Sequence, residues 1–519
     1  MTLLLTVSIA LASLAFASFL AVYTYGRFAT RARGPDSRAF ALPKAQTALD
    51  REAAKLVESA GGRNGLILLS NNLDAFAARA LTAQAASRSL DLIYYIWKAD
   101  LTGSLMLHEV IEAADRGARV RLLLDDINAH GNDDIWQLAL DSHRNIEVRL
   151  FNPGRARQGT FRRGIEVLLR PFSLTRRMHN KAWIADGRLA IIGGRNIGDG
   201  YFDAAETSNF HDLDLMMLGP AVQGTEEIFD AFWNSGSELP IRALAGEPRR
   251  RLKKLRSRLS AMAKGEEASP FLANLRRNVS VSAMLADPGE IHWTADAEVI
   301  SDPPEKAMGR KGDHWLTGRL GPVIASARHS LEITSPYFVP AESGTESLVA
   351  MAKRGVEVAV MTNSLAANDI AAVHGGYAPY RVALLKGGVK LYELQPEGRK
   401  SRLSILGSSR SSLHTKAFTV DDHTGFIGSF NFDARSISLN TEMGVLFNEP
   451  VLVERMRVLF RSETDPGSSY RVSLSKKGSL RWHGEKHCKL VVFDREPEAR
   501  FTRRLTAALI AWLPIESQL

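Results

Sequence analysis

The sequence predicts an α/β protein built of two similar halves, preceded by one membrane-spanning helix. An 18-residue pattern occurs twice, at 179–196 and 414–431, and the segments around the two copies resemble each other. Apolar runs of strand length alternate with helical periodicity in each half, which is typical of α/β sandwiches. The first 25 residues contain an uncharged apolar run. With 519 residues, 45% of them hydrophobic and 24% charged, the chain can form more than one domain and a large core.

The N-terminal run of 23 residues, Leu3 to Tyr25, carries no charged side chain. At about 1.5 Å per residue, a helix of this length crosses a bilayer. A cleaved signal peptide is the alternative, because Ala15-Phe16-Ala17 resembles a cleavage site. The chain lacks the basic start of a signal peptide, however, and the run is long for one, so we expect a retained anchor at 3–25. Basic residues follow at once and place the body in the cytoplasm, at an inner membrane: Arg27, Arg31, Arg33 and Arg38.

The duplication sets the expected domain boundaries. Residues 26–64 have little apolar periodicity and are expected to form a tether, in which 45–60 can be helical. Half one is expected at about 65–240 and half two at 296–519. Each half shows the order strand, helix, strand, helix, strand and then a hairpin, with largely parallel strands. Three pairs of segments carry the internal similarity: 89–97 with 330–339, 115–120 with 352–358, and 145–150 with 388–392.

Between the halves, residues 241–295 are expected to form a basic helical connector. Basic residues crowd the stretch from Arg249 to Arg258. Either a solvated helix or a helix lying on an anionic membrane fits this stretch. Apolar residues recur there at helical spacing: Leu252, Leu255, Leu259 and Met262. Over the whole chain, 66 Lys and Arg exceed 57 Asp and Glu, and this excess suits lipid headgroups and nucleic acid equally.

The repeated pattern fits H-x-K-x4-D-x6-G-x-x-N without gaps in both copies. In a strand, the alternation places His and Lys on one face, and a second short strand follows each Asp. A core hairpin can carry one such pattern by accident, but two complete copies indicate one site built from two halves. The first copy supplies His179, Lys181, Asp186 and Asn196, and the second supplies His414, Lys416, Asp421 and Asn431.

These side chains suit the cleavage of a phosphodiester. A neutral His can attack phosphorus and form a covalent phospho-enzyme, and a second, protonated His can give a proton to the leaving oxygen. Lys neutralises the developing charge, and Asn donates hydrogen bonds to the same oxygens. We expect neither a metal nor another cofactor, because protonated Lys has no lone pair and the zinc patterns C-x2-C and H-E-x-x-H are absent. The single cysteine, Cys488, excludes a disulfide framework.

The duplicated pattern resembles that of the phospholipase D superfamily, whose two motifs meet at one active site. Within it, the chain is most similar to bacterial cardiolipin synthases of the C type. The similarity extends along almost the whole chain, through segments 89–97, 115–126, 195–199, 212–214, 335–340 and 513–517. It implies that one His is the nucleophile and the other the general acid, and we assign His179 as nucleophile and His414 as acid.

The resemblance implies roles for residues around the two histidines. An acid downstream of each copy is expected to orient its His. Glu442 fits one copy and Asp212 the other, with Asp214 nearly as well placed. Gly194 departs from the family pattern, in which many members have Ser, so the phosphate pocket is expected to be slightly asymmetric. Asn196, Asn431 and Ser429 are expected to bind the phosphate, and Asp186 and Asp421 to brace the site.

Two further groups of residues stand out. Asp125 and Asp126 end a predicted strand, where α/β proteins bind ligands, and a helix-capping role fits them equally well. Aromatic residues on predicted strands are expected mainly in the core, with the alternative that some line the mouth of the site against acyl chains. They are Tyr94, Tyr95, Trp97, Tyr337 and Phe338.

Together these features predict a single-pass membrane enzyme that transfers a phosphatidyl group through a phosphohistidine intermediate. By resemblance the acceptor is phosphatidylglycerol, the donor is phosphatidylglycerol or phosphatidylethanolamine, and the product is cardiolipin. Hydrolysis, with water as the acceptor, is a related alternative. A membrane-tethered nuclease and a non-catalytic scaffold are alternatives of other classes, which the anchor and the two complete motifs disfavour. The sequence leaves the oligomeric state open.

Overall fold

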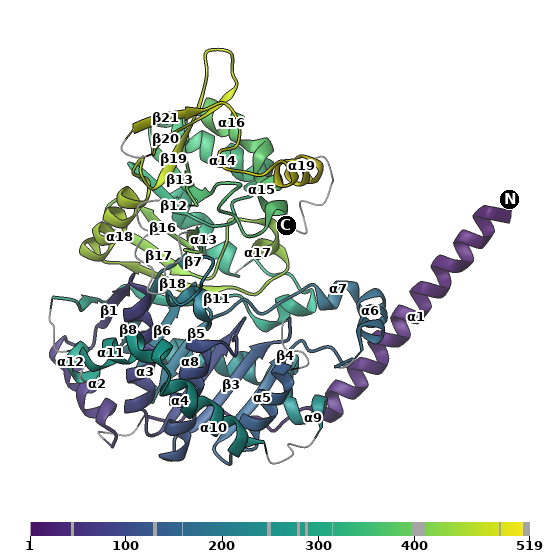
Figure 1. Ribbon diagram of the computed structural model, residues 1–519, viewed down its shortest axis with the longest axis vertical. Helices are drawn as coiled ribbons and strands as arrows, with labels where there is room; N and C mark the ends of the chain where they lie inside the picture. Colours follow the sequence, from purple (N-terminus) through teal and green to yellow (C-terminus); the bar gives the residue numbers. More distant parts are fainter. Residues whose placement is uncertain are drawn as a thin grey trace.

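Each half of the protein is centred on one large sheet, and the two halves lie one above the other in Figure 1. Helix α1 (Thr2–Ala32) projects from the side of this body. The computed structural model describes residues 2–42, 46–127, 132–157, 159–246, 251–277, 281–285, 289–313, 315–396, 411–486 and 489–511. The family-like segment at 513–517 and the basic residues Arg249 and Arg250 lie outside the described residues.

The first sheet has nine strands in the order β10-β1-β8-β6-β5-β2-β3-β4-β9. Its central strands β2, β3 and β4 are parallel, and every other neighbouring pair is antiparallel. The strand bounds are β1 Asn64–Leu69, β2 Ser89–Tyr94, β3 Arg119–Asp125, β4 Ile146–Phe151, β5 Ala182–Ala185, β6 Leu189–Gly193, β8 Asp214–Leu218, β9 Glu238–Pro240 and β10 His292–Thr294.

The second sheet has ten strands in the order β11-β18-β17-β16-β12-β13-β14-β19-β20-β21. From β11 to β19 this order repeats that of β1 to β9, which confirms the predicted duplication. The bounds are β11 Ala297–Ser301, β12 Ser330–Thr334, β13 Glu357–Asn363, β14 Lys390–Leu394, β16 Ala417–Val420, β17 Thr424–Gly428, β18 Met443–Asn448, β19 Ser469–Leu474, β20 Leu480–Lys486 and β21 Lys489–Phe493. Two short strands, β7 (Asn209–His211) and β15 (Ser411–Leu413), form a separate pair that joins the halves.

The helices cover the two sheets and fill the connections between strands. In the first half they are α2 Ala48–Ser59, α3 Asn72–Ala85, α4 Leu101–Asp115, α5 Asn132–Asp141, α6 Thr160–Leu169, α7 Pro171–Leu174, α8 Pro220–Trp233 and α9 Ile241–Ala245. The connector holds α10 Leu252–Ala263, α11 Ser269–Arg277 and α12 Val281–Leu285. The second half holds α13 Leu316–Ala325, α14 Ala341–Lys353, α15 Ala371–Tyr377, α16 Arg381–Lys386, α17 Ala434–Ser438, α18 Pro450–Glu463 and α19 Phe501–Ile510. Short 3₁₀ turns occur at Asp199–Tyr201, Glu266–Ala268, Pro304–Met308 and Ala378–Tyr380.

The expectation of largely parallel sheets is wrong, because each sheet is mixed. Parallel neighbours need a long crossover, which α4 and α5 provide between β2, β3 and β4. The motif strands β5 and β6 are joined by a tight turn, as are β16 and β17, so each pair is antiparallel. The motif hairpins therefore lie beside the parallel core of each sheet and bring the catalytic segments to its centre.

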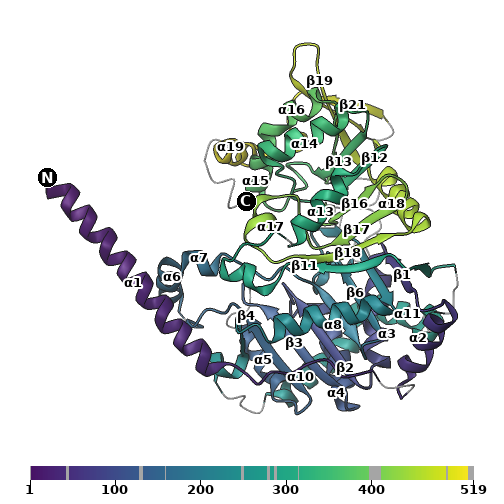
Figure 2. The ribbon, with the colours of Figure 1, turned by 180° about the vertical axis from the view of Figure 1, so that it is seen from behind.

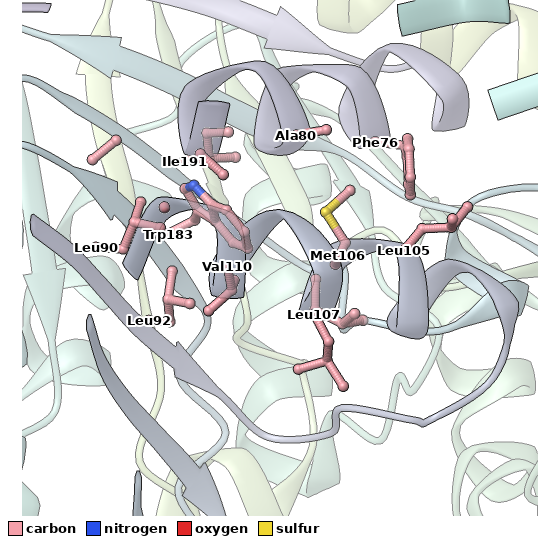
Figure 3. Packing of buried hydrophobic residues seen from close by; sticks show 14 of the residues in the cluster. Phe76, Ala80, Leu90, Leu92, Leu105, Met106, Leu107, Val110, Trp183 and Ile191 are labelled. Atoms are coloured by element: carbon pink, nitrogen blue, oxygen red, sulfur yellow. The ribbon is translucent and has the colours of Figure 1, made fainter. Parts of the chain in front are cut away.

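Two apolar cores hold the first half in place. In the first, α3 and α4 pack against the strands, and Figure 3 shows Val110 next to Trp183, with Met106 and Phe76 farther along the same core. The second core is shared, because it contains side chains from β6 and β8 of half one together with β17 and β18 of half two. Each fully buried side chain of this size contributes about 1.5–3 kcal/mol of transfer free energy, so the shared core fixes how the halves face each other.

The basic connector helix α10 uses its apolar side against the protein. Leu259 is buried in the first core, and Leu252, Leu255 and Met262 pack against that core. Arg256, at the edge of the same side, pairs with Asp115 of α4. The hypothesis that this helix lies on the membrane is therefore wrong in its simplest form, because its apolar residues are already covered by α4 and α5.

Helix α1 has the properties of a membrane span. Residues Leu4–Ala32 form a helix long and apolar enough to cross a bilayer, and its most apolar part is not buried by the protein. Near its C-terminal end it is fixed to the first half: Tyr25 Oη donates to Pro153 O at 2.7 Å, and the Arg170 guanidinium lies 3.4 Å from the Tyr25 ring centre. The span therefore leaves the body at a defined place.

Candidate active site

The two motif histidines are buried where the halves meet. His179 and His414 lie in extended segments directly before β5 and β16. The backbone of each segment pairs with the opposite half: His179 N donates to Thr441 O at 2.9 Å, and His414 N donates to His211 O at 2.8 Å. Both halves are therefore needed to place either histidine.

Each imidazole contacts a carboxylate of the opposite half. His179 Nδ1 lies 2.8 Å from Glu442 Oε2, and His414 Nδ1 lies 2.6 Å from Asp212 Oδ2. Glu442 is an anion and only accepts hydrogen bonds, so Nδ1 of His179 donates to it and Nε2 of His179 keeps its lone pair. This arrangement orients the nitrogen that a nucleophile needs.

The expectation that each acid orients the His of its own copy is wrong, because the pairing is crossed between the halves. Glu442 directly follows Thr441, and Asp212 directly follows His211, the two residues whose carbonyls hold the opposite motif. Asp214, the second candidate, is instead bound to two guanidinium groups, Arg79 at 2.8 Å and Arg195 at 3.2 Å.

Hydrogen bonds hold Glu442 as an anion. Ser429 Oγ donates to it at 2.5 Å and Ser436 Oγ at 2.9 Å. Burial alone raises the pKa of Glu442, but His179, Lys181 and the Ser429 hydrogen bond outweigh burial and hold that pKa below its usual value. Ser429 was predicted to bind the phosphate, and in this structure its hydroxyl is engaged with the carboxylate.

Asp212 has a different environment. Burial raises the pKa of Asp212 to about 6, although Lys416 and Arg195 oppose the rise. A Cβ at Gly194 would lie 2.2 Å from Asp212 Oδ1, so glycine is needed there. Half one therefore has a glycine, Gly194, beside its aspartate, whereas half two has Ser429 beside the longer acid Glu442. The two sides of the site are asymmetric.

The two motif lysines are buried beside the histidines. Lys181 Nζ donates to His179 O at 2.6 Å, and Lys416 Nζ donates to His414 O. Burial lowers the pKa of Lys181 to about 7 and that of Lys416 to about 8. A phosphodiester anion in the site would favour the charged form of both lysines.

Burial also favours the neutral form of both histidines. It lowers the pKa of His179 to about 4, although Glu442 opposes this shift. It lowers the pKa of His414 well below the usual value, and the two motif lysines act in the same direction. Neutral imidazole is the form that can attack phosphorus.

The motif asparagines flank the histidines. Asn196 accepts from Ile96 N at 3.1 Å, and its amide nitrogen donates to Tyr201 Oη at 2.9 Å. Asn431 is buried, and its Oδ1 has no hydrogen-bond partner among the described residues. Phosphate binding by Asn431 would use its amide N–H groups, because Oδ1 is an acceptor and cannot bind a phosphoryl oxygen, so the predicted role stays a prediction.

The motif aspartates lie away from the reacting groups. Asp186 Oδ1 accepts from the backbone amides of Ser87, Arg88 and Ser89 at 2.7–3.1 Å, at the start of β2. Asp421 does the same at the start of β12 for Arg328, His329 and Ser330. Both aspartates have a positive φ, 53° and 54°, in the turn of the motif hairpin. They brace the hairpins against the parallel strands and are not catalytic groups in this geometry.

The predicted aromatic residues separate into core and site. Tyr94, Trp97 and Phe338 are buried in the cores. Tyr95 lies edge-on to His179 with ring centres 4.8 Å apart. Tyr337 Oη donates to both Asp369 oxygens at 2.8 Å.

Sequence reasoning missed two aromatic residues around His414. Tyr201 and Phe210 lie with ring centres 5.2 Å and 5.1 Å from the imidazole. No motif marks them, and only their place between the first motif and Asp212 could have indicated them.

The aspartate pair after β3 is structural. Asp125 accepts from Met178 N and Ile127 N, both at 2.8 Å, and so holds the segment that leads into His179. Asp126 pairs with Arg157 at 2.5 Å and accepts from Gly154 N at 2.8 Å. These contacts are to loop amides and to an arginine, and none is to the first turn of a described helix, so they do not show the predicted helix capping.

One group of side chains in the described part of the chain has the spacing of a metal site: His374, Glu393 and Glu496. It contains none of the motif residues. The guanidinium of Arg381 lies 3.2 Å from Glu393 and 2.6 Å from Glu496, and it already neutralises both carboxylates. The cluster is therefore an internal ion-pair network.

Known proteins show the same organisation. The family model described as "Cardiolipin synthase, PLD-like domain" matches residues 81–233 and 320–464. Cardiolipin synthase C of Escherichia coli (strain K12) is 39% identical over 468 residues, which cover 88% of this chain and 96% of that protein. An uncharacterized protein of Helicobacter pylori is 31% identical over 466 residues, covering 87% of this chain and 89% of its own length.

A solved structure supports the fold independently. The crystal structure of phosphatidylserine synthase from Haemophilus influenzae Rd KW20 aligns with a TM-score of 0.54 at 13% identity, covering 81% of this chain and 91% of that chain. The family model spans both motif copies, and the E. coli relative is similar over nearly its full length. The chain therefore belongs to the phospholipase D-like cardiolipin synthase family.

Proposed function

We propose that this protein is a membrane-anchored phosphatidyltransferase that makes cardiolipin from phosphatidylglycerol and a second phospholipid. The observation that carries the proposal is the pair of histidines, each oriented by a carboxylate of the opposite half and flanked by a buried lysine. The printed name of the E. coli relative supports cardiolipin as the product. The two halves, about 65–240 and 296–519, together with the connector at 241–295, act as one catalytic unit in this proposal.

The first step forms a phosphohistidine. His179 Nε2 attacks phosphorus of the donor lipid, and a nitrogen–phosphorus bond replaces the bond to the headgroup oxygen. His414 gives a proton to that oxygen, and the headgroup alcohol leaves. Lys181 and Lys416 neutralise the phosphoryl oxygens as charge builds up, and the amides of Asn196 and Asn431 donate to them.

In the second step, His414 acts as a base instead of an acid. His414, now neutral, takes the proton from a hydroxyl of phosphatidylglycerol, and that oxygen displaces His179 from phosphorus. The nitrogen–phosphorus bond breaks, cardiolipin forms and His179 is restored. Water in place of the lipid hydroxyl would give phosphatidic acid, so transfer requires a site that excludes water.

The asymmetry of the two acids supports this assignment of roles. His179, Lys181 and the Ser429 hydrogen bond hold the pKa of Glu442 below its usual value, and an anion at Nδ1 makes Nε2 of His179 a better nucleophile. Burial raises the pKa of Asp212 to about 6, whereas the pKa of Glu442 is held below its usual value, so Asp212 binds a proton more readily than Glu442 does. A pair that carries a proton suits the general acid.

The proposal also places the protein in the inner membrane, with a single span and the body in the cytoplasm. The apolar helix α1 and the arginines that follow it support this orientation. Reactivity of a cysteine introduced at Arg38 toward a membrane-impermeant reagent, in intact cells and in inverted vesicles, tests it. Labelling in intact cells would contradict a cytoplasmic body.

The test of function uses the full-length protein reconstituted in vesicles of labelled phosphatidylglycerol, with and without phosphatidylethanolamine. We expect labelled cardiolipin, and the His179→Ala protein serves as the blank. Phosphatidic acid as the main product would indicate a hydrolase. Cleavage of plasmid DNA without lipid turnover would indicate a nuclease. A parallel sample with EDTA should form product at the same rate, and a loss restored by zinc or magnesium would overturn the metal-free mechanism.

A further inference from the structure

Two surface helices, α6 and α19, turn their apolar residues away from the protein. A surface helix of a soluble domain normally packs its apolar face on the core and exposes its polar face. Here Phe161 of α6 is 80% exposed and Phe501 of α19 is 77% exposed. Contiguous apolar surface of this kind marks an interaction site.

In α6 the apolar face is continuous, and the polar face is held by the protein. Phe161, Ile165 and Leu168 follow the spacing i, i+4, i+7 and are all exposed. On the inner side, Glu166 accepts from Arg155 N at 2.9 Å and pairs with Arg170 at 2.7 Å. These contacts fix the helix with its apolar face outward.

Helix α19 has the same inverted arrangement. Phe501, Leu505 and Leu509 lie at i, i+4 and i+8 and are all exposed. On the inner side, Arg504 donates to Glu496 O at 2.9 Å, and Arg503 donates to the carbonyls of Ala366 and Asn368. The charged residues of this helix are thus used to attach it, and its apolar residues are left outside.

Both helices lie on the side from which α1 projects. Figures 1 and 2 show α6 next to α1 and α19 above it on the same side of the body, seen from opposite directions. The contact between α6 and α1 is direct at its ends. Arg170, which follows α6, lies over Tyr25, and the Arg155 guanidinium lies 4.8 Å from the Phe28 ring centre. Helix α6 is therefore held beside the predicted membrane span by the residues that flank it.

Two further exposed apolar residues are sequence neighbours of residues that contact the active site. Ser436 of α17 donates to Glu442, and its neighbour Ile437 is 47% exposed. Asp369 binds Tyr337 and is near enough to His414 for its charge to act on the pKa of that imidazole, and its neighbour Ile370 is 46% exposed. Helices α15 and α17 face the same side as α6 and α19 in both views.

We propose that α6 and α19 are docking helices that lie in the interface of the bilayer crossed by α1, and that they hold the mouth of the active site at the lipid headgroups. Exposed arginines accompany the apolar residues, Arg162 on α6 and Arg500 at the start of α19, which suits an anionic bilayer. The proposal rests on α1 as a membrane span and does not depend on which lipid is made.

The direct test measures the depth of labelled residues in a membrane. The full-length protein, with Cys488→Ser, carries a single new cysteine at Phe161 or Leu505, labelled with an environment-sensitive dye. It is reconstituted in vesicles of phosphatidylcholine and phosphatidylglycerol with nitroxide-labelled acyl chains. The matched control is Val458 of α18, which is 51% exposed against 49% for Leu505 and lies on the opposite side of the body.

We expect the dyes at 161 and 505 to emit at shorter wavelength and to be quenched by the nitroxide lipids, while the dye at 458 is not. Equal signals at all three positions would overturn the proposal, whether or not the protein makes cardiolipin. If the wild-type protein makes no cardiolipin but the dyes at 161 and 505 of the labelled variants are shielded, the proposed product would be refuted and docking supported.

A second test separates docking from catalysis. The double variant Phe161→Glu/Leu505→Glu removes apolar contact from both helices and leaves α1 in place. We expect its turnover of phosphatidylglycerol in vesicles to fall roughly tenfold or more, because interfacial affinity depends on buried apolar area. The double variant should cleave the soluble ester bis(p-nitrophenyl) phosphate at the wild-type rate. The control variant Val458→Glu should keep wild-type rates with both substrates. Unchanged turnover in vesicles, or an equal loss with both substrates, would count against docking.

Discussion

At the residue scale, each histidine depends on groups from both halves. The backbone at Thr441 and the carboxylate of Glu442 place His179, and the backbone at His211 and the carboxylate of Asp212 place His414. Neither half holds a complete nucleophile or a complete acid. The duplicated motif therefore forms one site, rather than two sites that work independently.

The first prediction is that His179→Ala and His414→Ala each reduce cardiolipin formation by about 10⁴-fold or more. The two residues act as one catalytic unit, so losing either costs nearly as much as losing both. The measurement is initial rate in vesicles, with circular dichroism to verify folding. His423→Ala, a change at an exposed histidine, is the control. Retention of most activity by either variant would refute the shared site.

The second prediction tests the crossed pairing through the covalent intermediate. With His414 removed, an activated phosphodiester should still phosphorylate His179, because a good leaving group needs little proton donation. Adding Glu442→Gln should slow this labelling by about 10²-fold or more, by analogy with a catalytic triad that loses its orienting acid. Adding Asp212→Asn instead should have little effect.

The adduct is mapped by mass spectrometry at neutral pH, because phosphohistidine is acid-labile. If Asp212→Asn slowed labelling and Glu442→Gln did not, the crossed assignment would fail. An adduct on His414 in the His179→Ala protein, with none on His179 in the reciprocal variant, would exchange the roles of the two histidines and leave the two-histidine mechanism intact.

The third prediction concerns stability and pH. Burial lowers the pKa of His179 to about 4 from its usual 6.5. Between these values the unfolded chain binds a proton that the folded protein does not, so stability falls as the pH falls through this window. One such group changes the unfolding free energy by up to about 1.4 kcal/mol per pH unit.

Chemical unfolding in detergent at several pH values measures the slope. We expect His179→Gln to show a smaller slope than wild type between about pH 4 and 6.5, with equal slopes above that range. The exposed residue His423, replaced in the same way, should leave the slope unchanged. If His179→Gln kept the full wild-type slope, burial of this imidazole would not govern the acid sensitivity.

Most of the candidate site could be predicted at this scale, because its residues lie at fixed distances in a repeated pattern. The sequence does not predict which histidine each of the two acids, Glu442 and Asp212, contacts. Pairing of Glu442 with His179 depends on how the two halves face each other, and a linear sequence holds no signal for that. Tyr201 and Phe210 were missed for the same reason, since aromatic rings serve a core and a site equally well.

At the element scale, the motif hairpins are held against the parallel strands by their aspartates. Asp186 and Asp421 each bind three successive backbone amides at the start of β2 and β12. Those amides precede the strands and would otherwise lack partners. The side chains that look catalytic in the motif therefore connect two elements, and the pattern alone could not distinguish bracing from chemistry.

The fourth prediction follows from that role. Asp186→Ala should lower the free energy of unfolding by about 3 kcal/mol or more, because it leaves three amides without an acceptor. The kcat of the folded fraction should change only a few-fold. Thermal unfolding and kcat are measured on the same preparation, and Asp422→Ala, at an exposed carboxylate beside Asp421, is the control. A large loss of kcat without a loss of stability would indicate that Asp186 takes part in the reaction.

The order of elements was predictable because each half alternates strands with helices, but two features of the elements were not. Strand direction in a mixed sheet depends on how strands are connected and paired. The motif hairpins have short turns, but β8, β9 and β10 pair antiparallel with strands that are distant in the sequence. The connector helix α10 has an apolar side that suits a membrane or a protein core equally, and only the position of α4 decides which one covers it.

At the scale of the whole molecule, the halves share one apolar core. Ile192 and Leu215 of half one pack in the same cluster as Ile427 and Phe447 of half two. Separating the halves would expose this cluster and unpair β7 from β15, which carry the catalytic segments. The site and the interface between the halves are therefore formed by the same contacts.

The fifth prediction is that the two halves unfold together. Phe447→Ala in the shared core should cost about 3–5 kcal/mol, as should Phe76→Ala in the first core. Hydrogen exchange of the full-length protein in detergent reports on both halves at once. Each variant should lower the protection of β5 and β6 and of β16 and β17 by the same free energy, because opening either half exposes the shared cluster. If each substitution lowered protection only in its own half, the halves would be independent units. In that case the active site would form only while the two halves are in contact. Activity would then be lost at a lower denaturant concentration than the one that unfolds either half.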